Sequence, residues 1–338
     1  MRKYLPGFAV ILAIAIPARF VQTQIVVNGR EVVSAVAIAI LAGILIRNLL
    51  GLPDACRPGA SYAVKRILRI GIGLMGAQLS LGQVLKTGAA SVLVVAICIA
   101  LAILVVRFVS VRMGMSERLG TLLGVGTSIC GVSAIVATAP VIEAREEETS
   151  LAVATITVFG LLAVVLYPLL GRLLGLSDTF FGTWAGTAVN DTSQVVATGL
   201  IYSPQAGETA TVVKLTRNLF MAPVIVGFSW LYFARRQAEG KAQGRGVGVK
   251  WAQAVPLFVL GFLGMAILNS LGAFSPSIRQ GLQTVSQFLI VCALAGVGLE
   301  TSVSSMKTIG LRPFYAGLCA AGFMAAVSFA LITLVGIR

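Results

Sequence analysis

Two polar stretches interrupt an otherwise apolar sequence and carry the side chains best suited to chemistry. The first is GTAVNDTSQVVATG, residues 186–199, in which the five polar residues NDTSQ follow one another. The second is GVGTSICGVSAIVATAP, residues 124–140, which combines hydroxyl side chains with glycines. Both contain nearly the same phrase, IVAT and VVAT. Hydroxyl and amide side chains donate hydrogen bonds, so the two stretches predict one shared polar site.

The residue types of this site favour an anion. Glycines and small polar residues inside a membrane span suit a broken helix, whose unwound backbone must line a cavity or be buried in protein. Freed N–H groups at a half-helix N-terminus attract anions through the helix dipole. Lys214 and Arg217 add positive charge, and the Arg fork matches oxyanions. The predicted substrate-binding residues are Thr127, Ser128, Gly131, Ser133, Asn190, Thr192, Ser193, Lys214 and Arg217.

Asp191 is the ionisable residue of the first stretch. A charged side chain at the bilayer centre costs roughly 2.5–3.5 kcal/mol on insertion scales, so it is functional by default. We expect Asp191, with Asn190 and Gln194, to bind a coupling ion, either H⁺ or Na⁺, or Asp191 to pair with a basic residue such as Arg217. Arg217→Gln should then abolish anion binding and leave the folded yield intact. For a single glycine or serine, close helix packing is the alternative.

Other charged residues have simpler explanations. Lys65 and Arg66, at a helix entrance, suit anchoring by the positive-inside rule or snorkelling, and Arg69 follows one turn later. Glu300 is expected to be solvated at the end of its helix. GIGLMG, residues 71–76, has the form GxGxxG, but a dinucleotide site requires a preceding strand in a βαβ unit. An apolar membrane helix does not supply one.

Composition indicates the class of protein that holds these residues. Of 338 residues, 57% are hydrophobic and 11% are charged, and the mean hydropathy is +0.95. A soluble domain carries roughly 25% charged residues. Repeated apolar runs about 20 residues long therefore predict an all-α polytopic membrane protein. The net charge of +14 fits Lys and Arg in cytoplasmic loops better than it fits nucleic acid binding.

The sequence contains few residues that could form a catalytic or metal-binding site. Histidine is absent, which removes the commonest metal ligand and the commonest general base. The five cysteines show no CxxC spacing, so we predict that they are reduced and have no metal or disulfide role. No pair of intramembrane aspartates is predicted. We expect no enzyme activity, no catalytic residue, no metal and no cofactor besides the coupling ion.

Apolar segments predict about eleven membrane-spanning helices. They fall near residues 5–20, 32–50, 65–82, 88–108, 119–140, 150–171, 180–200, 209–233, 252–272, 282–299 and 311–336. The first is predicted to be a retained helix, because no small-x-small cleavage site follows it. The positive-inside rule places the basic linker 234–250 in the cytoplasm. The N-terminus is then cytoplasmic and the C-terminus lies outside.

Setting residues 1–30 aside as an extra N-terminal helix leaves ten predicted helices. A five-and-five division gives repeats at 31–172 and 173–338 with opposite orientation, as in many secondary transporters. The echo between VKRILR and VKLTRN supports this division. A competing echo pairs GILIRNLLG with GMAILNSLG, seven helices apart, so the repeat boundary stays open.

Four motifs together resemble the bacterial YeiH-type (UPF0324) family, also called a sulfate exporter family. They are, in order, GIGLMGAQLS, GTSICGVSAIVATAPVIEA, GTAVNDTSQVVATG and VKLTRNLFMAP. The resemblance extends roughly over residues 30–335. The family is grouped with the bile acid, arsenite and riboflavin transporter superfamily. The resemblance implies inverted five-helix repeats, a panel and a core domain, and discontinuous helices that cross near the membrane centre.

The expected function is secondary active transport of a small anion across the inner, cytoplasmic membrane by alternating access. Sulfate or a sulfonate is favoured, and the family name implies export. One alternative is a Na⁺-coupled organic anion symporter of the bile acid transporter type, and another is a passive anion channel. The expected partners are the anionic substrate and the lipid bilayer. A homodimer is left open, and no nucleic acid is expected.

Overall fold

The computed structural model describes residues 2–24, 26–27, 30–31, 35–238, 257–302 and 311–337, which are mostly helical. The α-helices are α1 Leu5–Gln24, α2 Ala35–Leu49, α3 Arg57–Tyr62, α4 Leu68–Met75, α5 Leu81–Arg112, α6 Glu117–Ser128, α7 Val132–Thr138, α8 Glu146–Leu173, α9 Asp178–Ala188, α10 Thr192–Tyr202, α11 Pro204–Leu219, α12 Met221–Ala238, α13 Leu257–Ser270, α14 Pro276–Glu300 and α16 Leu311–Val335. A π-helix, Ala63–Ile67, joins α3 to α4. Short 3₁₀ turns occupy Arg2–Tyr4 and Gly76–Gln78, and β1 (Val26–Val27) pairs antiparallel with β2 (Arg30–Glu31).

The described residues confirm an all-helical membrane protein in which six helical stretches are long and apolar enough to cross a membrane. These stretches are Leu5–Gln24, Leu81–Arg112, Glu146–Leu173, Pro204–Tyr232, Pro276–Glu300 and Leu311–Val335. Several predicted spans are divided into shorter helices, for example 119–140 into α6 and α7, and 180–200 into α9 and α10. A length criterion does not count such pieces. The predicted total of about eleven spans and the inverted repeats therefore stay predictions.

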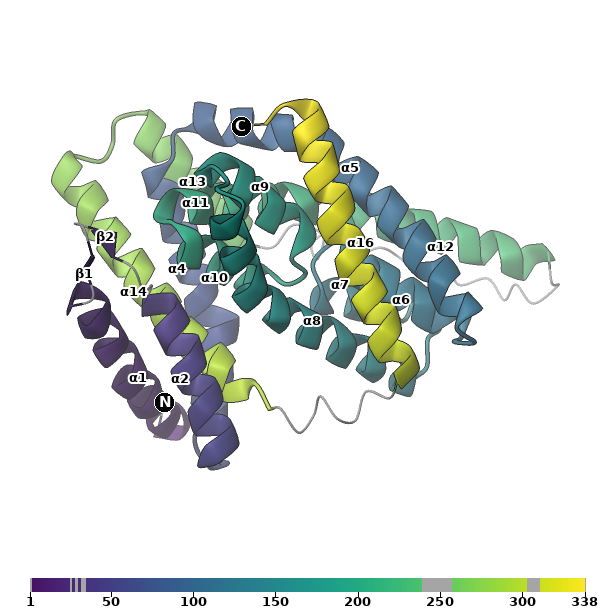
Figure 1. Ribbon diagram of the computed structural model, residues 1–338, viewed down its shortest axis with the longest axis horizontal. Helices are drawn as coiled ribbons and strands as arrows, with labels where there is room; N and C mark the ends of the chain where they lie inside the picture. The colour runs from purple at the N-terminus through teal and green to yellow at the C-terminus, as the bar shows by residue number, and fades with distance from the viewer. Residues whose placement is uncertain are drawn as a thin grey trace.

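The helices form two groups, each with its own apolar packing (Figure 1). Group one contains α1, α2, α3, α4, α13 and α14, and group two contains α5, α6, α7, α8, α9, α11, α12 and α16. In group one, Gly43 of α2 packs directly on α14, because a Cβ there would lie 2.6 Å from the Ala295 carbonyl. Such small residues let membrane helices approach closely.

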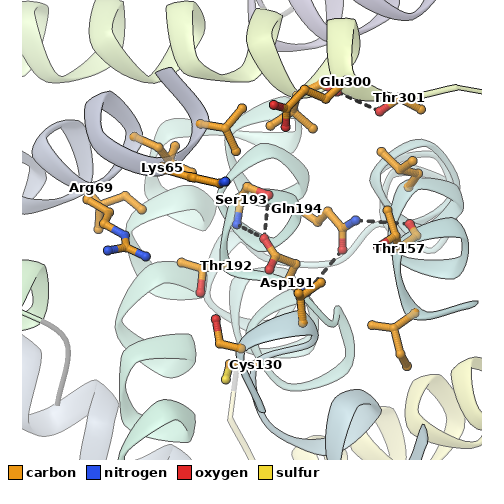
Figure 2. A pocket seen from close by; sticks show the side chains of 18 of the residues that line it. Lys65, Arg69, Cys130, Thr157, Asp191, Thr192, Ser193, Gln194, Glu300 and Thr301 are labelled. Carbon is orange, nitrogen blue, oxygen red and sulfur yellow. Dashed lines mark hydrogen bonds between the residues drawn. The ribbon is translucent and has the colours of Figure 1, made fainter. Parts of the chain in front are cut away.

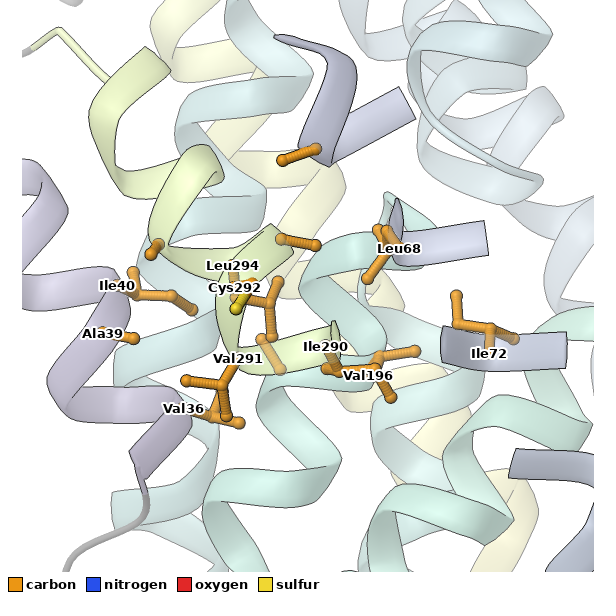
Figure 3. Close-up of a cluster of buried hydrophobic side chains, with 14 of the residues drawn as sticks. Val36, Ala39, Ile40, Leu68, Ile72, Val196, Ile290, Val291, Cys292 and Leu294 are labelled. Carbon is orange, nitrogen blue, oxygen red and sulfur yellow. The ribbon is translucent and has the colours of Figure 1, made fainter. Parts of the chain in front are cut away.

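Helix α10 lies where the two groups meet, and residues of α5, α8 and α11 also enter the core of group one: Val84, Val164, Val212 and Leu215. Val196 of α10 lies beside Ile72 of α4 and Ile290 of α14 in the apolar core of group one (Figure 3). Val195, its neighbour, packs in the core of group two. Because the short half-helix contacts both cores, the break that precedes it lies at the boundary between the groups.

The orientation in the membrane stays a prediction. In the view of Figure 1 the N-terminus lies at the lower left and the C-terminus at the top, left of centre. Helix α12 continues to Ala238, so the first residues of the predicted linker 234–250 are helical. The rest of that linker lies outside the described residues.

Candidate functional site

Both polar stretches form broken helices, as the sequence predicts. Helix α6 ends at Ser128 and α7 begins at Val132, while α9 ends at Ala188 and α10 begins at Thr192. The two breaks are in contact, because a Cβ added to Gly131 would lie 3.5 Å from the Cα of Asp191. Two unwound turns from different parts of the chain therefore meet at one point.

Gly131 supplies the backbone geometry of the first break. Its φ of +65° and ψ of −124° lie in a region that L side chains adopt only with strain. Gly131→Ala should lower the free energy of unfolding by about 1–3 kcal/mol, measured by thermal unfolding in detergent. Gly227→Ala is the control, because it lies inside α12 and its Cβ would meet nothing within 4 Å. Equal midpoints for the two variants would contradict the assignment.

Asp191 is the N-cap of α10. One oxygen of its carboxylate accepts from the Ser193 amide at 2.9 Å and from the Ser193 hydroxyl at 2.6 Å. The Gln194 side-chain oxygen accepts from the Asp191 amide at 3.2 Å and completes a capping box. The Gln194 amide nitrogen donates to the Thr157 carbonyl at 3.2 Å and ties α10 to α8 (Figure 2). The protein's own carboxylate thus occupies the N–H groups that the sequence analysis assigned to a substrate anion.

Lys214 of α11 binds backbone carbonyls at both breaks. Its side chain is completely buried. The ammonium donates to the Ile129 carbonyl at 2.7 Å and to the Val189 carbonyl at 3.3 Å, and it also donates to the Asn190 carbonyl. All three carbonyls belong to unwound turns, where no helical N–H group follows to satisfy them.

Arg217 performs the same task one turn further along α11, and it is 1% exposed. Its Nε donates to the Ser128 carbonyl at 2.5 Å, and a terminal nitrogen donates to the Val189 carbonyl at 2.8 Å. The guanidinium also donates to the carbonyls of Thr127 and Gly186. The negative ends of the α6 and α9 dipoles are therefore capped by cations.

The positions of Lys214 and Arg217 differ from the predicted substrate role. Both side chains donate hydrogen bonds to helix-end carbonyls, and neither lines the cavity described below. Among the ion pairs of the described residues, none joins Arg217 to Asp191. Their spacing along α11 brings both cations to one side of the helix, but the partners that they meet there come from α6 and α9. Their function in the structure is to hold the two breaks together.

A cavity of about 580 Å³ opens beside the two breaks (Figure 2). Five of the residues that the sequence analysis predicted line it: Ser133, Asp191, Thr192, Ser193 and Gln194. The other predicted residues lie outside its lining: Thr127, Ser128, Gly131, Asn190, Lys214 and Arg217. The structure therefore places the N-terminal turns of α7 and α10 at the cavity, whereas the C-terminal ends of α6 and α9 are buried behind them.

The predicted residues that do not line the cavity are buried around the two helix breaks. The Asn190 side-chain amide donates to the Ile156 carbonyl of α8 at 3.4 Å, and the residue is 3% exposed. The Ser128 hydroxyl donates to the Val125 carbonyl within its own helix at 3.3 Å. Thr127 is 1% exposed. These side chains pack the crossing of the two broken helices and do not face the cavity.

Helix group one contributes charges to the cavity that the sequence analysis did not place there. Lys65, on the π-helix, and Arg69, on α4, line it together with Glu300 at the end of α14. Figure 2 shows Lys65 and Arg69 reaching toward the first turn of α10. Arg69 also lies 5.9 Å from the centre of the Phe258 ring. The π-helix has no clear sequence signature, and it frequently marks functional positions.

The cavity also contains a buried amide. Asn218 of α11 lines it, is 5% exposed, and has no hydrogen-bond partner for its side-chain oxygen among the described residues. The Cys130 sulfur lies 3.7 Å from that of Met221, and both residues border the cavity. In the part of the chain that the structure describes, no three residues of the types His, Cys, Asp and Glu gather where they could share a metal ion.

Comparisons with known proteins assign the chain to a family. A family model described as conserved hypothetical protein 698 matches residues 6–317. A UPF0324 membrane protein of Streptococcus pyogenes serotype M18 is 37% identical over 329 residues, which cover 94% of each chain. The chain belongs to the UPF0324 family. This confirms the resemblance found in the sequence motifs.

Other UPF0324 relatives are similar over nearly their whole length. A membrane protein of Nitratidesulfovibrio vulgaris is 32% identical over 339 residues, covering 98% of this chain and 93% of the relative. One of Bacillus cereus is 30% identical over 330 residues, covering 98% and 94%. Both are named UPF0324 membrane proteins, as is the relative from S. pyogenes. The membrane location of this chain agrees with its apolar helices.

Proposed function

We propose that this UPF0324 protein is a secondary transporter that moves a small anion, sulfate or a sulfonate, across the inner membrane by alternating access. The observation that supports this most is the cavity of about 580 Å³, which is bordered by two broken helices and has cationic side chains on one wall. Broken helices around a central site are typical of secondary transporters. Unwound backbone is tolerated at membrane depth where it lines such a cavity.

Lys65 and Arg69 take the anion-binding role that the sequence analysis gave to Lys214 and Arg217. Both line the cavity and are exposed to it. Arg binds oxyanions through paired donors, and Lys adds a compact charge. The hydroxyl of Thr192, on the facing turn of α10, is a further hydrogen-bond donor for the same anion, whereas that of Ser193 donates to Asp191.

Asp191 carries the coupling ion in this proposal. It is half-buried, it lines the same cavity as the two cations, and its carboxylate is fixed by its role as N-cap. Binding of H⁺ or Na⁺ there would offset the charge of an entering anion. The two helix groups, which meet along α10, would then move relative to each other around the site. The inverted repeats 31–172 and 173–338, a cytoplasmic N-terminus and an outer C-terminus belong to the same proposal.

An organic anion is the second candidate substrate, because of the size of the cavity. A volume of about 580 Å³ lies within the range of about 300–1,000 Å³ that is typical of pockets for drug-sized ligands. Sulfate alone would leave much of that volume to water. A Na⁺-coupled organic anion symporter would use the same residues, and dependence of uptake on Na⁺ would identify it.

Removing the positive charges of Lys65 and Arg69, which group one contributes to the cavity, tests the proposed function. Lys65→Gln and Arg69→Gln should each weaken binding of labelled sulfate or propane-1-sulfonate by about tenfold or more. A hydrogen bond to a charged group contributes about 1.5–3 kcal/mol, and 1.4 kcal/mol is tenfold in affinity. Arg66→Gln is the matched control, because Arg66 lies on the same π-helix and does not line the cavity. Equal weakening in all three variants would remove Lys65 and Arg69 from the site.

A further inference from the structure

The charges around the cavity are balanced and come from both helix groups. Its described lining has two cationic side chains, Lys65 and Arg69, and two carboxylates, Asp191 and Glu300. Among the ion pairs of the described residues, none joins any of these four to another. The hydrogen-bond donors of the carboxylates are the hydroxyl and amide of Ser193 for Asp191 and Ser61 for Glu300, and Lys65 also lies near enough to Glu300 to attract it electrostatically. Both signs of charge therefore face the cavity.

A simple dianion does not match this balance. The four charged side chains of the lining sum to zero, and the buried cations Lys214 and Arg217 behind it are directed to helix-end carbonyls. A sulfate in the cavity would therefore face two carboxylates that repel it. The carboxylates would have to be neutralised to remove this repulsion. A molecule that carries one charge of each sign needs no such compensation.

The unpaired amide oxygen of Asn218 indicates which kind of group the ligand brings. A buried acceptor without a donor is destabilising, and such groups in native structures normally have a partner. Asn218 is 5% exposed and lines the cavity. Sulfate and unsubstituted sulfonates have no N–H or O–H group to donate to it. A protonated amine has three N–H donors when it is primary.

Two of the acceptors, Asp191 and Asn218, lie across the cavity lining from the helices that carry the cations, whereas Glu300 belongs to group one with the cations. Asp191 caps α10, and Asn218 lies on α11, which packs against α10. Lys65 and Arg69 belong to the π-helix and α4 of group one. Apolar side chains complete the wall between them, among them Leu68, Ile72, Ile156, Val158, Leu161 and Val297. This arrangement suits a short aliphatic molecule with an oxyanion at one end and an ammonium at the other.

We propose that the substrate is a small zwitterion, an aminosulfonate or an amino acid, whose oxyanion binds Lys65 and Arg69 and whose protonated amine binds Asp191 and Asn218. This inference rests on the proposed transport function and specifies its substrate. A ligand held at both ends joins the two helix groups. Its binding therefore favours whichever arrangement of the groups brings the two sets of residues to the ligand's length.

Matched ligand pairs test the inference. The purified protein is titrated with 3-aminopropanesulfonate and propane-1-sulfonate, and with 4-aminobutyrate and butyrate, and calorimetry measures the affinities. The amine-bearing member of each pair should bind at least tenfold more tightly. Asn218→Leu and Asp191→Asn should each reduce that preference by about tenfold. Asn218→Leu should leave the affinity for propane-1-sulfonate within about twofold, and Asp191→Asn, which removes a negative charge from the cavity, should not weaken it. Thr216→Val, on α11 outside the cavity lining, should keep the preference.

The outcomes separate the inference from the proposed function. If propane-1-sulfonate binds and the amine adds nothing, the zwitterion inference is wrong and the proposed anion transport stands. If the preference survives in both Asn218→Leu and Asp191→Asn, the assignment of the amine site is wrong. If none of the four compounds binds to protein that is folded by gel filtration and circular dichroism, both the inference and the proposed function are wrong. Asp191→Asn keeps the helix cap, so it remains informative if Asn218→Leu does not fold.

Discussion

Lys214→Met should lower the free energy of unfolding by about 3 kcal/mol or more and sharply reduce the folded yield. The substitution leaves two buried carbonyls, those of Ile129 and Asn190, without their donor, whereas the Val189 carbonyl keeps the hydrogen bond from Arg217. Each unsatisfied buried group costs about 1–3 kcal/mol. Arg217→Leu should have a comparable effect, because it also releases the carbonyls of two helix ends.

Fluorescence-detected gel filtration and thermal unfolding in detergent measure this prediction. Lys86→Met in α5 is the matched control, because Lys86 is exposed. Its stability should stay within about 0.5 kcal/mol of the wild type. Because Arg217 also binds buried carbonyls at both breaks, we expect Arg217→Gln to lower the folded yield, in contrast to the expectation from the sequence. A Lys214→Met protein that is as stable as the wild type, and has lost only anion binding, would return Lys214 to the substrate site.

Asp191→Asn should abolish coupling to the driving ion while it preserves the fold. Asn is as good an N-cap as Asp, so the start of α10 and its capping box with Gln194 should persist. The titratable charge is lost, so an imposed proton or Na⁺ gradient should no longer accelerate uptake. Asp191→Ala should lose coupling too, and should also lower stability by about 0.5–2 kcal/mol through loss of the cap.

The pair of Asp191 variants separates charge from structure. Gradient-driven uptake into proteoliposomes measures coupling, and thermal unfolding measures the cap. If coupling is normal in Asp191→Asn, the NDTSQ segment has only a structural function, which is to start helix α10. A stability loss in the Asn variant as large as in the Ala variant would contradict the capping interpretation.

The broken helices could be predicted from the sequence. Adjacent polar side chains inside an apolar run have few hydrogen-bond partners in an intact membrane helix, and glycines beside them favour a break. NDTSQ marks the start of α10, and GTSICG marks the break after α6. The number of spans could not be counted in the same way, because each break divides one apolar run into two short helices.

The functions of individual charged residues were harder to predict, because they depend on contacts distant in the sequence. The three-residue spacing of Lys214 and Arg217 indicated a shared helix face, but not that the carbonyls at both breaks lie opposite it. Lys65 was assigned to anchoring because its position on a π-helix at the cavity has no sequence signature. Asn218 could not be identified from the sequence, since its unpaired oxygen is visible only in three dimensions.

The contact between the two breaks also bears on the predicted repeats. Under the division at residues 172 and 173, the segment of α6 and α7 is the fourth predicted helix of its half, whereas that of α9 and α10 is the first of the other half. The two breaks therefore meet in space without occupying equivalent positions in a five-and-five scheme. The competing sequence similarity does not make them counterparts either, because it pairs segments seven predicted helices apart, whereas the two breaks are two predicted helices apart.

Uptake of labelled sulfate and labelled 3-aminopropanesulfonate into proteoliposomes, with and without an imposed proton or Na⁺ gradient, tests the transport function most directly. Saturable uptake that responds to one of the gradients, is absent from empty liposomes, and falls about tenfold in Lys65→Gln is the predicted result. Flux that rises linearly with concentration would indicate a passive channel. No uptake of either compound by protein shown to be folded would contradict the proposed transport.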